Sequence, residues 1–243
     1  GVVTCPVPMC YRVVATVTPP NMALIPEGSF VMGNATNVFA ASEGIDGELP
    51  QHTVVVSAFD MDKYEVTKAL WDEVTAYNGG NGYEYSNPGS GNDANHPVDT
   101  VNWFDVVKWC NARSQCNGLT PVYYTDEGFT TVYKTDEIIP FANWAANGFR
   151  LPTEAEWEKA ARGGVADTRF PWADYTNRTS HAKANYYGDS GTFSYDLSSG
   201  PHPTYGGSAS PVGSFAPNGY GLYDMAGNVG EWCWDRYDIS YYS

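Results

Sequence analysis

The chain has 243 residues, which is enough to bury one large hydrophobic core or two smaller ones. Its 28 acidic and 13 basic residues give a formal net charge of −15, and so acidic a surface repels phosphate backbones and argues against a nucleic-acid partner. No apolar run approaches the roughly 18–20 residues that cross a bilayer, so we expect no membrane span.

The first third of the chain is rich in β-prone residues. Residues 1–20 predict an N-terminal extension or edge strand ahead of a single domain over residues 21–243. Next, "MALIPEGSFVMGN" contains two short apolar runs on either side of Pro-Glu-Gly at 26–28, a pattern typical of a hairpin. The stretch "HTVVVSAFDMDKYEV" predicts one continuous buried strand.

Three helices follow, each with a clear start signal. Thr67 can cap "KALWDEVTAY", and Asn102 can cap "WFDVVKWCNARSQC". Thr153 and Glu156 have the spacing of a capping box at the start of "EAEWEKAARGG", where we expect Trp157 to be buried. Long stretches rich in Gly, Asn, Ser and Tyr separate these elements. Few helices, short strands and much ordered loop predict one α+β domain.

The cysteines do not form a metal site by their spacing. The chain has five, an odd number, and neither CxxC nor a His/Cys cluster with zinc spacing is present. Cys5 and Cys10 flank a short Pro-containing segment and can staple a turn. Cys110 and Cys116 lie six residues apart on one predicted helix, so they point to different faces, and Cys110 fits core packing. Cys233 is either a partner for a cysteine elsewhere or a small buried hydrophobe.

Seven phrases occur in a fixed order from about residue 21 onward. They are "IPEGSFVMG", "HTVVVSAFDMDKYEVT", "HPVDTVNWFDVVKWCN", "GFRLPTEAEWEKAARGG", "FPWAD", "HAKANYYG" and "SPVGSFAPNGYGLYDMAGNVGEW". In this order they resemble the formylglycine-generating sulfatase-modifying enzyme family. The resemblance implies a loop-rich variant of the C-type-lectin-like fold, an α+β fold with little regular secondary structure and with bound calcium.

The last phrase contains a Gly-rich loop that the resemblance identifies as a calcium site. It implies that the side chains of Asp224 and Glu231 and the main-chain carbonyls of Gly227 and Val229 bind the ion. Calcium prefers six to eight oxygen ligands, both carboxylate and carbonyl, in flexible geometry. The alternative is a plain Gly-rich turn in which Glu231 forms a salt bridge.

The resemblance implies a second calcium site, made by an Asn, the carbonyl of the next residue and a downstream Asp. Asn185 and Tyr186 match the first two positions. The third position falls in an expanded loop, where simple alignment reaches Thr204. Asp189 or Asp196 could supply the carboxylate instead.

The family's oxidative chemistry depends on a C-terminal cysteine pair that binds copper and activates O₂. No such pair follows the Gly-rich loop up to Ser243, so the predicted domain lacks its C-terminal segment. We expect copper only if a cysteine pair exists beyond Ser243. Cys110 and Cys116 do not replace the pair, because they lie on opposite sides of one helix. No catalytic residue is therefore predicted within the chain.

Two functions remain open. In the first, the complete domain oxidises a sulfatase cysteine to formylglycine. In the second, the chain is a non-catalytic, calcium-bound module that displays a ligand-binding surface, as in variable proteins of diversity-generating retroelements, since Tyr-, Asn-, Gly- and Ser-rich surfaces suit recognition. A third, an iron-dependent sulfoxide synthase, needs a His-rich helical domain that the sequence lacks. Either of the first two implies a protein or peptide partner and a secreted, periplasmic or cell-surface location.

Overall fold

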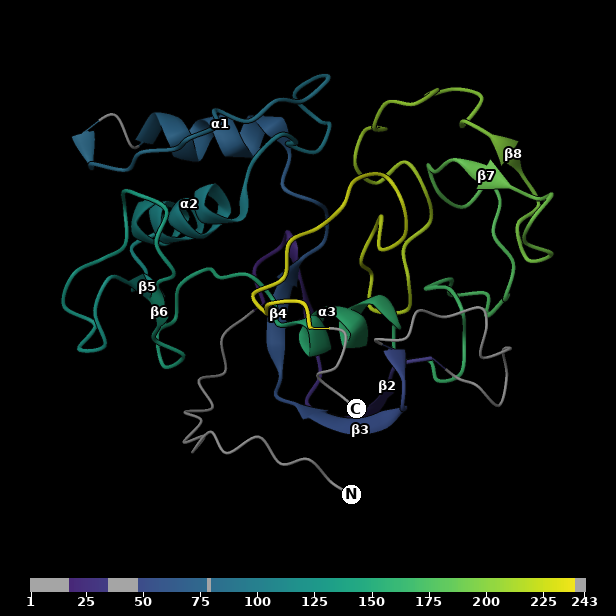
Figure 1. Ribbon diagram of the computed structural model, residues 1–243, viewed down its shortest axis with the longest axis horizontal. Coiled ribbons are helices and arrows are strands. Elements are labelled where there is room, and N and C mark those ends of the chain that lie inside the picture. The colour runs from purple at the N-terminus through teal and green to yellow at the C-terminus, as the bar shows by residue number, and fades with distance from the viewer. Residues whose placement is uncertain (1–17, 35–47, 78–79, 239–243) are drawn as a thin grey trace.

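The computed structural model describes residues 18–34, 48–77 and 80–238. The extension predicted at residues 1–20 lies almost entirely outside the described residues. In chain order the elements are β1 (Met22–Ile25), β2 (Gly28–Met32), β3 (His52–Val56), β4 (Phe59–Asp62), α1 (Lys68–Tyr77), α2 (Trp103–Cys116), β5 (Tyr123–Tyr124), β6 (Phe141–Ala142), α3 (Glu154–Ala161), β7 (Gly188–Asp189) and β8 (Ser199–Gly200). Figure 1 shows α1 lying along α2, strands β2 to β4 grouped near α3, and long loops between these groups. The predicted loop-rich α+β architecture is confirmed.

Strands β1 to β4 pair differently from the sequence prediction. The hairpin expected at residues 26–28 is wrong, because β1 pairs with β4 and β2 pairs with β3, both antiparallel. The register is continuous across the two pairs: Ile25 faces Phe59, and Gly28 faces Val56 three residues further along. The four strands therefore form one long ribbon that is interrupted in its middle.

A proline and a lysine occupy the interruption of this ribbon. Pro26 has no N–H to donate to a ladder, so pairing stops there. From helix α3, the Nζ of Lys159 donates to the carbonyl oxygens of Pro26 at 2.6 Å and Gly28 at 2.9 Å. The same break divides the opposite side into β3 and β4, which corrects the prediction of one continuous buried strand.

The three helices begin where the sequence predicts. The Thr67 hydroxyl accepts from the amide of Leu70 at 3.2 Å. Asn102 at the start of α2 and Thr153 at the start of α3 both form full capping boxes with the acidic residue three positions on. Local hydrogen bonding defines these ends, and this explains why sequence alone finds them. The prediction that Trp157 is buried is wrong, since its side chain is half-exposed on α3.

Two hydrophobic cores hold the elements together. The larger one lies around α1 and α2, where the rings of Trp71 and Trp109 stack with centroids 5.3 Å apart. The smaller one joins β1 to α3 through Ile25, Ala160 and Leu222. None of the helices in the described part of the chain combines the length and apolar character needed to cross a bilayer. Long loops connect the two cores, and the candidate site lies in one of them.

Candidate metal site

The loop from residue 224 to residue 231 is coiled by residues in the left-handed backbone region. Asp224, Gly227 and Asn228 have φ of 56°, 83° and 65°. Asp and Asn tolerate this region better than other side-chain-bearing residues, and Gly enters it freely. Gly227 is also required by space, because a Cβ there would lie 2.5 Å from the carbonyl oxygen of Asn185. The sequence "DMAGN" therefore encodes a tight loop that packs closely on the chain around residue 185.

Asp224 carries a carboxylate oxygen with no partner. Its Oδ2 accepts from the amide of Gly213 at 2.6 Å, but its Oδ1 is buried and has no hydrogen-bond partner. Burial raises the pKa of Asp224, and the Gly213 amide offsets this only in part. A buried carboxylate oxygen without a partner is costly, and a cation would remove that cost.

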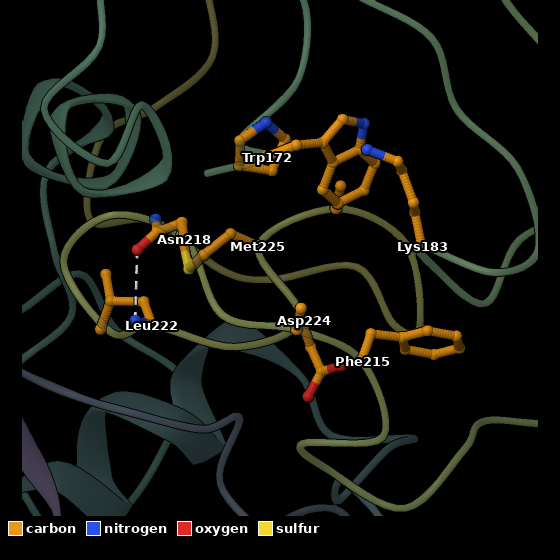
Figure 2. A pocket seen from close by; sticks show the side chains of 10 residues that line it. Trp172, Lys183, Phe215, Asn218, Leu222, Asp224 and Met225 are labelled. Carbon is orange, nitrogen blue, oxygen red and sulfur yellow. Dashed lines mark hydrogen bonds between the residues drawn. The ribbon is translucent and has the colours of Figure 1, made fainter. Parts of the chain in front are cut away.

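Lys183, a nearby cation, does not neutralise Asp224. Figure 2 shows a small cavity of about 10 Å³ beside this residue, with Trp172 and Lys183 on one side and the Asp224 carboxylate directed away from them. The Nζ of Lys183 instead forms an ion pair with Asp174 at 2.6 Å and donates to the hydroxyl of Thr176. The charge of Asp224 thus has no ion-pair partner from Lys183.

Glu231 supplies a second carboxylate at the other end of the loop. Its Oε2 accepts from the indole Nε1 of Trp157 at 2.5 Å, which gives the half-exposed tryptophan of α3 a polar role. Protein atoms around the carboxylate raise its pKa, and the negative charge of Asp224 raises it further. The residue nevertheless keeps an exposed surface, so an ion can reach it from solvent.

A third carboxylate, Glu65, approaches the same loop from between β4 and α1. Its Oε2 accepts from the side-chain amide of Asn228 at 2.7 Å, and its Oε1 accepts from the backbone amide of Val229 at 3.4 Å. Burial and the charges of Glu231 and Asp224 raise the pKa of Glu65 to about 8, against the lowering effect of its two hydrogen bonds. The sequence prediction missed Glu65. The only available signal is an acidic residue directly after the apolar strand segment "FDMDKYEV".

These residues fit a calcium ion better than a transition metal. In the described part of the chain, no three His, Cys, Asp or Glu side chains converge to hold an ion by themselves. An ion bound here would need main-chain carbonyls besides carboxylates, and calcium accepts such mixed oxygen ligands. The structure places the four predicted ligands, Asp224, Gly227, Val229 and Glu231, on one coiled loop, with the unpartnered Oδ1 of Asp224 at its start.

The residues predicted for the second site lie against the first loop. Asn185 is buried, and its side-chain amide donates to the carbonyl of Ser208 at 2.9 Å and to Oδ1 of Asn228 at 3.3 Å. The carbonyl oxygen of Asn185 accepts from the backbone amide of Asn228 at 2.8 Å. The Tyr186 carbonyl lies 3.1 Å from the Nε2 of His181. The structure therefore joins the two predicted sites through Asn228.

The candidates for the third ligand of that second site already have partners. Asp196 is buried and accepts from the hydroxyl of Tyr186 at 2.5 Å and from the backbone amides of Asp189 and Ser198. Oδ1 of Asp189 accepts from the amide of Thr192 at 3.1 Å. These bonds fold the expanded loop around β7 and β8. A calcium ion bound by Asn185 and Tyr186 remains a prediction.

The described cysteines do not fit a copper site. Cys110, Cys116 and Cys233 are free thiols that are buried, exposed and half-buried, respectively. Burial raises the pKa of Cys110 and Cys233 to about 12, so neither thiol is poised as a thiolate. The predicted core role of Cys110 and the different environment of Cys116 are confirmed. Cys5 and Cys10 lie outside the described residues.

An open cavity of about 480 Å³ adjoins the same loop. It is lined by aromatic and basic side chains from α3 and from the chain near residue 170, among them Trp157, Arg162, Arg169, Phe170 and Tyr195. Cavities of this size accommodate small ligands or side chains of a bound peptide. Trp157 thus lies between the cavity and the carboxylate of Glu231.

Comparisons with known proteins agree on one family. The model of the "Sulfatase-modifying factor enzyme 1-like domain" matches residues 12–243. The chain is 33% identical over 198 residues to "Chaperone protein LppX" of Paenibacillus barcinonensis, covering 75% of this chain and 64% of that protein. It is 30% identical over 232 residues to "Formylglycine-generating enzyme" of Bos taurus, covering 91% of this chain and 59% of that protein. The chain thus spans about 60% of the length of these two relatives.

A solved structure supports the same fold. Treponema denticola variable protein 1 superposes with a TM-score of 0.62 at 29% sequence identity, covering 91% of this chain and 75% of that one. That degree of similarity extends over both cores and the loops between them. The two kinds of relative, an enzyme and a variable protein, share one loop-rich scaffold.

Proposed function

Because the chain belongs to the family of sulfatase-modifying factor enzyme 1-like domains, we propose that it forms the calcium-organised part of a formylglycine-generating enzyme. In this proposal the complete domain oxidises a cysteine of a sulfatase to formylglycine, and the partner is the sulfatase chain. A location outside the cytoplasm, where calcium is abundant, belongs to the same proposal.

The unpartnered Oδ1 of Asp224 carries the calcium part of the proposal. Buried polar atoms in folded proteins nearly always have partners, so an exception indicates a missing ion or water. Three carboxylates around one coiled loop, Glu65, Asp224 and Glu231, favour a cation. The carbonyls of Gly227 and Val229 would complete the ligand set, and the main effect of the ion would be to hold the loop in its folded form.

We assign no oxidation step to the described residues. Copper bound by two cysteine thiolates supplies the O₂ chemistry in this family, and thiolate ligands suit Cu(I). Cys110 is enclosed in the core, and Cys116 and Cys233 are separate single thiols. We therefore propose that the reactive cysteine pair is supplied from outside residues 1–243.

Thermal unfolding with and without chelator tests the calcium part. A ligand that binds only the native state stabilises it by about 2.7 kcal/mol at a concentration of 100 Kd. For a chain of this length that corresponds to a rise in Tm of about 5–11 °C. The Asp224→Asn variant keeps an acceptor for the Gly213 amide but removes the charge, so it should lose most of this rise. Asp72→Asn, on the exposed side of α1, is the matched control and should behave as wild type. A wild-type Tm that does not respond to chelator would contradict calcium binding.

Mass spectrometry of a Cys-containing sulfatase peptide tests the enzymatic part. We expect residues 1–243 with copper and O₂ to leave the peptide unchanged, and a longer chain that includes a cysteine pair to form the aldehyde. Aldehyde formed by residues 1–243 alone would place the chemistry on the cysteines of this chain. No aldehyde from the longer chain would favour the second function.

The second function is ligand display without catalysis, and a specific observation favours it. The structure resembles Treponema denticola variable protein 1, and several aromatic side chains face solvent, including Tyr175, Tyr187 and Trp232. Exposed tyrosines and tryptophans give large contact areas at a low cost in conformational entropy. In this case the calcium-bound loop would support a binding surface, and the result with the longer chain would separate the two functions.

A further inference from the structure

Glu65 connects two parts of the chain that are far apart in sequence. It lies between β4 and α1, and its bonds to Asn228 and Val229 span 163 and 164 residues. It is part of no helix or strand, and neither hydrogen bond is needed to end one. Its contacts go instead to the middle of the coiled loop, between the carboxylates of Asp224 and Glu231.

Asn228 passes the effect of Glu65 to the rest of the loop. Its amide nitrogen donates to Glu65, so its Oδ1 faces the other way and accepts from the backbone amide of Ser210 at 2.7 Å. The same Oδ1 accepts from the side chain of Asn185 at 3.3 Å. Glu65 therefore fixes the orientation of an amide that joins three chain segments. The second bond, to the amide of Val229, fixes the peptide unit whose following carbonyl is a proposed calcium ligand.

Glu65 also adds charge to the site without being a direct ligand. Its negative charge interacts with those of Glu231 and Asp224. The three side chains do not converge on one point, so an ion held by the loop would not contact all of them. Asp224, nine-tenths buried with an unpartnered Oδ1, shows independently that the loop lacks a positive group.

We propose that Glu65 is a positioning residue of the calcium site: it orients the peptide unit at residues 228–229 and supplies a negative charge that raises affinity for a divalent cation. The proposal rests on the calcium binding proposed above. In the absence of the cation, the same charge destabilises the loop, because three carboxylates then repel one another. Glu65 should thus have opposite effects on the ion-free and ion-bound forms.

The Glu65→Gln variant separates the two contributions. Its amide oxygen can still accept from Asn228, whereas the charge is lost. Glu73→Gln, on the exposed surface of α1, removes the same charge far from the loop and is the control. The measurements are the Kd for calcium, the emission of bound terbium excited through the nearby Trp157, and the Tm in calcium and in chelator.

We expect Glu65→Gln to weaken calcium affinity by about tenfold or more, as is usual for partners that orient metal ligands. Its Tm in chelator should equal or exceed that of wild type, while its gain from calcium should be smaller. An affinity equal to that of wild type, or an equal fall in Tm with and without calcium, would overturn the proposal and leave calcium binding intact. No calcium binding by wild type would overturn both.

A second variant covers the case in which Glu65→Gln does not fold. Asn228→Gly keeps the backbone φ of 65° and the amide bond to Asn185, but removes the side chain that Glu65 orients. It should also weaken calcium affinity. Unchanged affinity in Asn228→Gly would show that the connection through Asn228 has no effect on the site and would contradict the orienting role.

Discussion

Replacing Asn111 with leucine should strongly destabilise the protein, because this one buried side chain serves several backbone groups. Its Oδ1 accepts from the amides of Val122 at 3.1 Å and Tyr123 at 3.0 Å. Its Nδ2 donates to the carbonyls of Tyr123 at 2.7 Å and Tyr133 at 3.0 Å. Asn111 lies on α2, so these bonds attach the short strand β5 to the helix. Leucine has a similar volume but can make none of them.

The expected loss follows from which groups are left without a partner. The Tyr123 carbonyl keeps a second donor, the amide of Tyr133, whereas the amides of Val122 and Tyr123 and the Tyr133 carbonyl each lose the bond to Asn111. A buried polar group left unpaired costs about 1–3 kcal/mol, so three cost at least about 3 kcal/mol. For a chain of this length, 3 kcal/mol lowers Tm by about 6–12 °C. Urea and thermal unfolding, followed by tryptophan fluorescence in saturating calcium, measure the loss.

Asn117 at the end of the same helix provides the control. Its side chain is exposed and makes one bond, to the carbonyl of Arg113 at 2.8 Å, so Asn117→Leu should cost less than about 1 kcal/mol. If Asn111→Leu costs no more than Asn117→Leu, the buried amide is not what holds β5 to the helix. In that event the packing of the larger core alone would explain the arrangement.

Two further predictions concern pH and thiol reactivity. Burial raises the pKa of Glu156, but the hydrogen bonds and charge of Arg150 outweigh it, and the pKa lies below its usual 4.5; this stabilisation is present above about pH 4.5 and disappears as pH falls through the lowered pKa, so the difference in unfolding free energy between wild type and Glu156→Gln should shrink on acidification. A constant difference from about pH 6 to about pH 3 would contradict this assignment. Iodoacetamide, followed by peptide mass mapping, should modify the exposed Cys116 well before the buried Cys110, whose pKa is raised to about 12; equal rates would mean that α2 opens readily.

The features that sequence predicts well are those determined by neighbouring residues. The caps at Thr67, Asn102 and Thr153 depend on residues within three positions, and the structure has all three. Likewise, the Gly-rich composition after residue 218 predicts a coiled loop, because few other residues enter the left-handed region.

The features that sequence misses depend on partners far along the chain. Pro-Glu-Gly at 26–28 is equally compatible with a hairpin and with an interruption in a longer ribbon, and only the pairing of β1 with β4 distinguishes them. Trp157 has the spacing of a core residue, but its indole is directed to Glu231, 74 residues away. Glu65 is missed for the same reason, since its partner Asn228 is 163 residues away.

The low content of strand and helix explains why the gap at Asp224 is informative. Where a ladder would satisfy the backbone, this protein uses buried amide side chains: Asn218 accepts from the amides of Tyr220 and Leu222 and donates to the carbonyl of Ala160, as Asn111 does around β5. Such a protein is stable only if nearly every buried polar atom has a partner, because each exception costs 1–3 kcal/mol that no regular ladder offsets. The Oδ1 of Asp224 is an exception on the loop where the carboxylates gather. The missing partner must then come from outside the chain, and a cation satisfies both the oxygen and the surplus of negative charge.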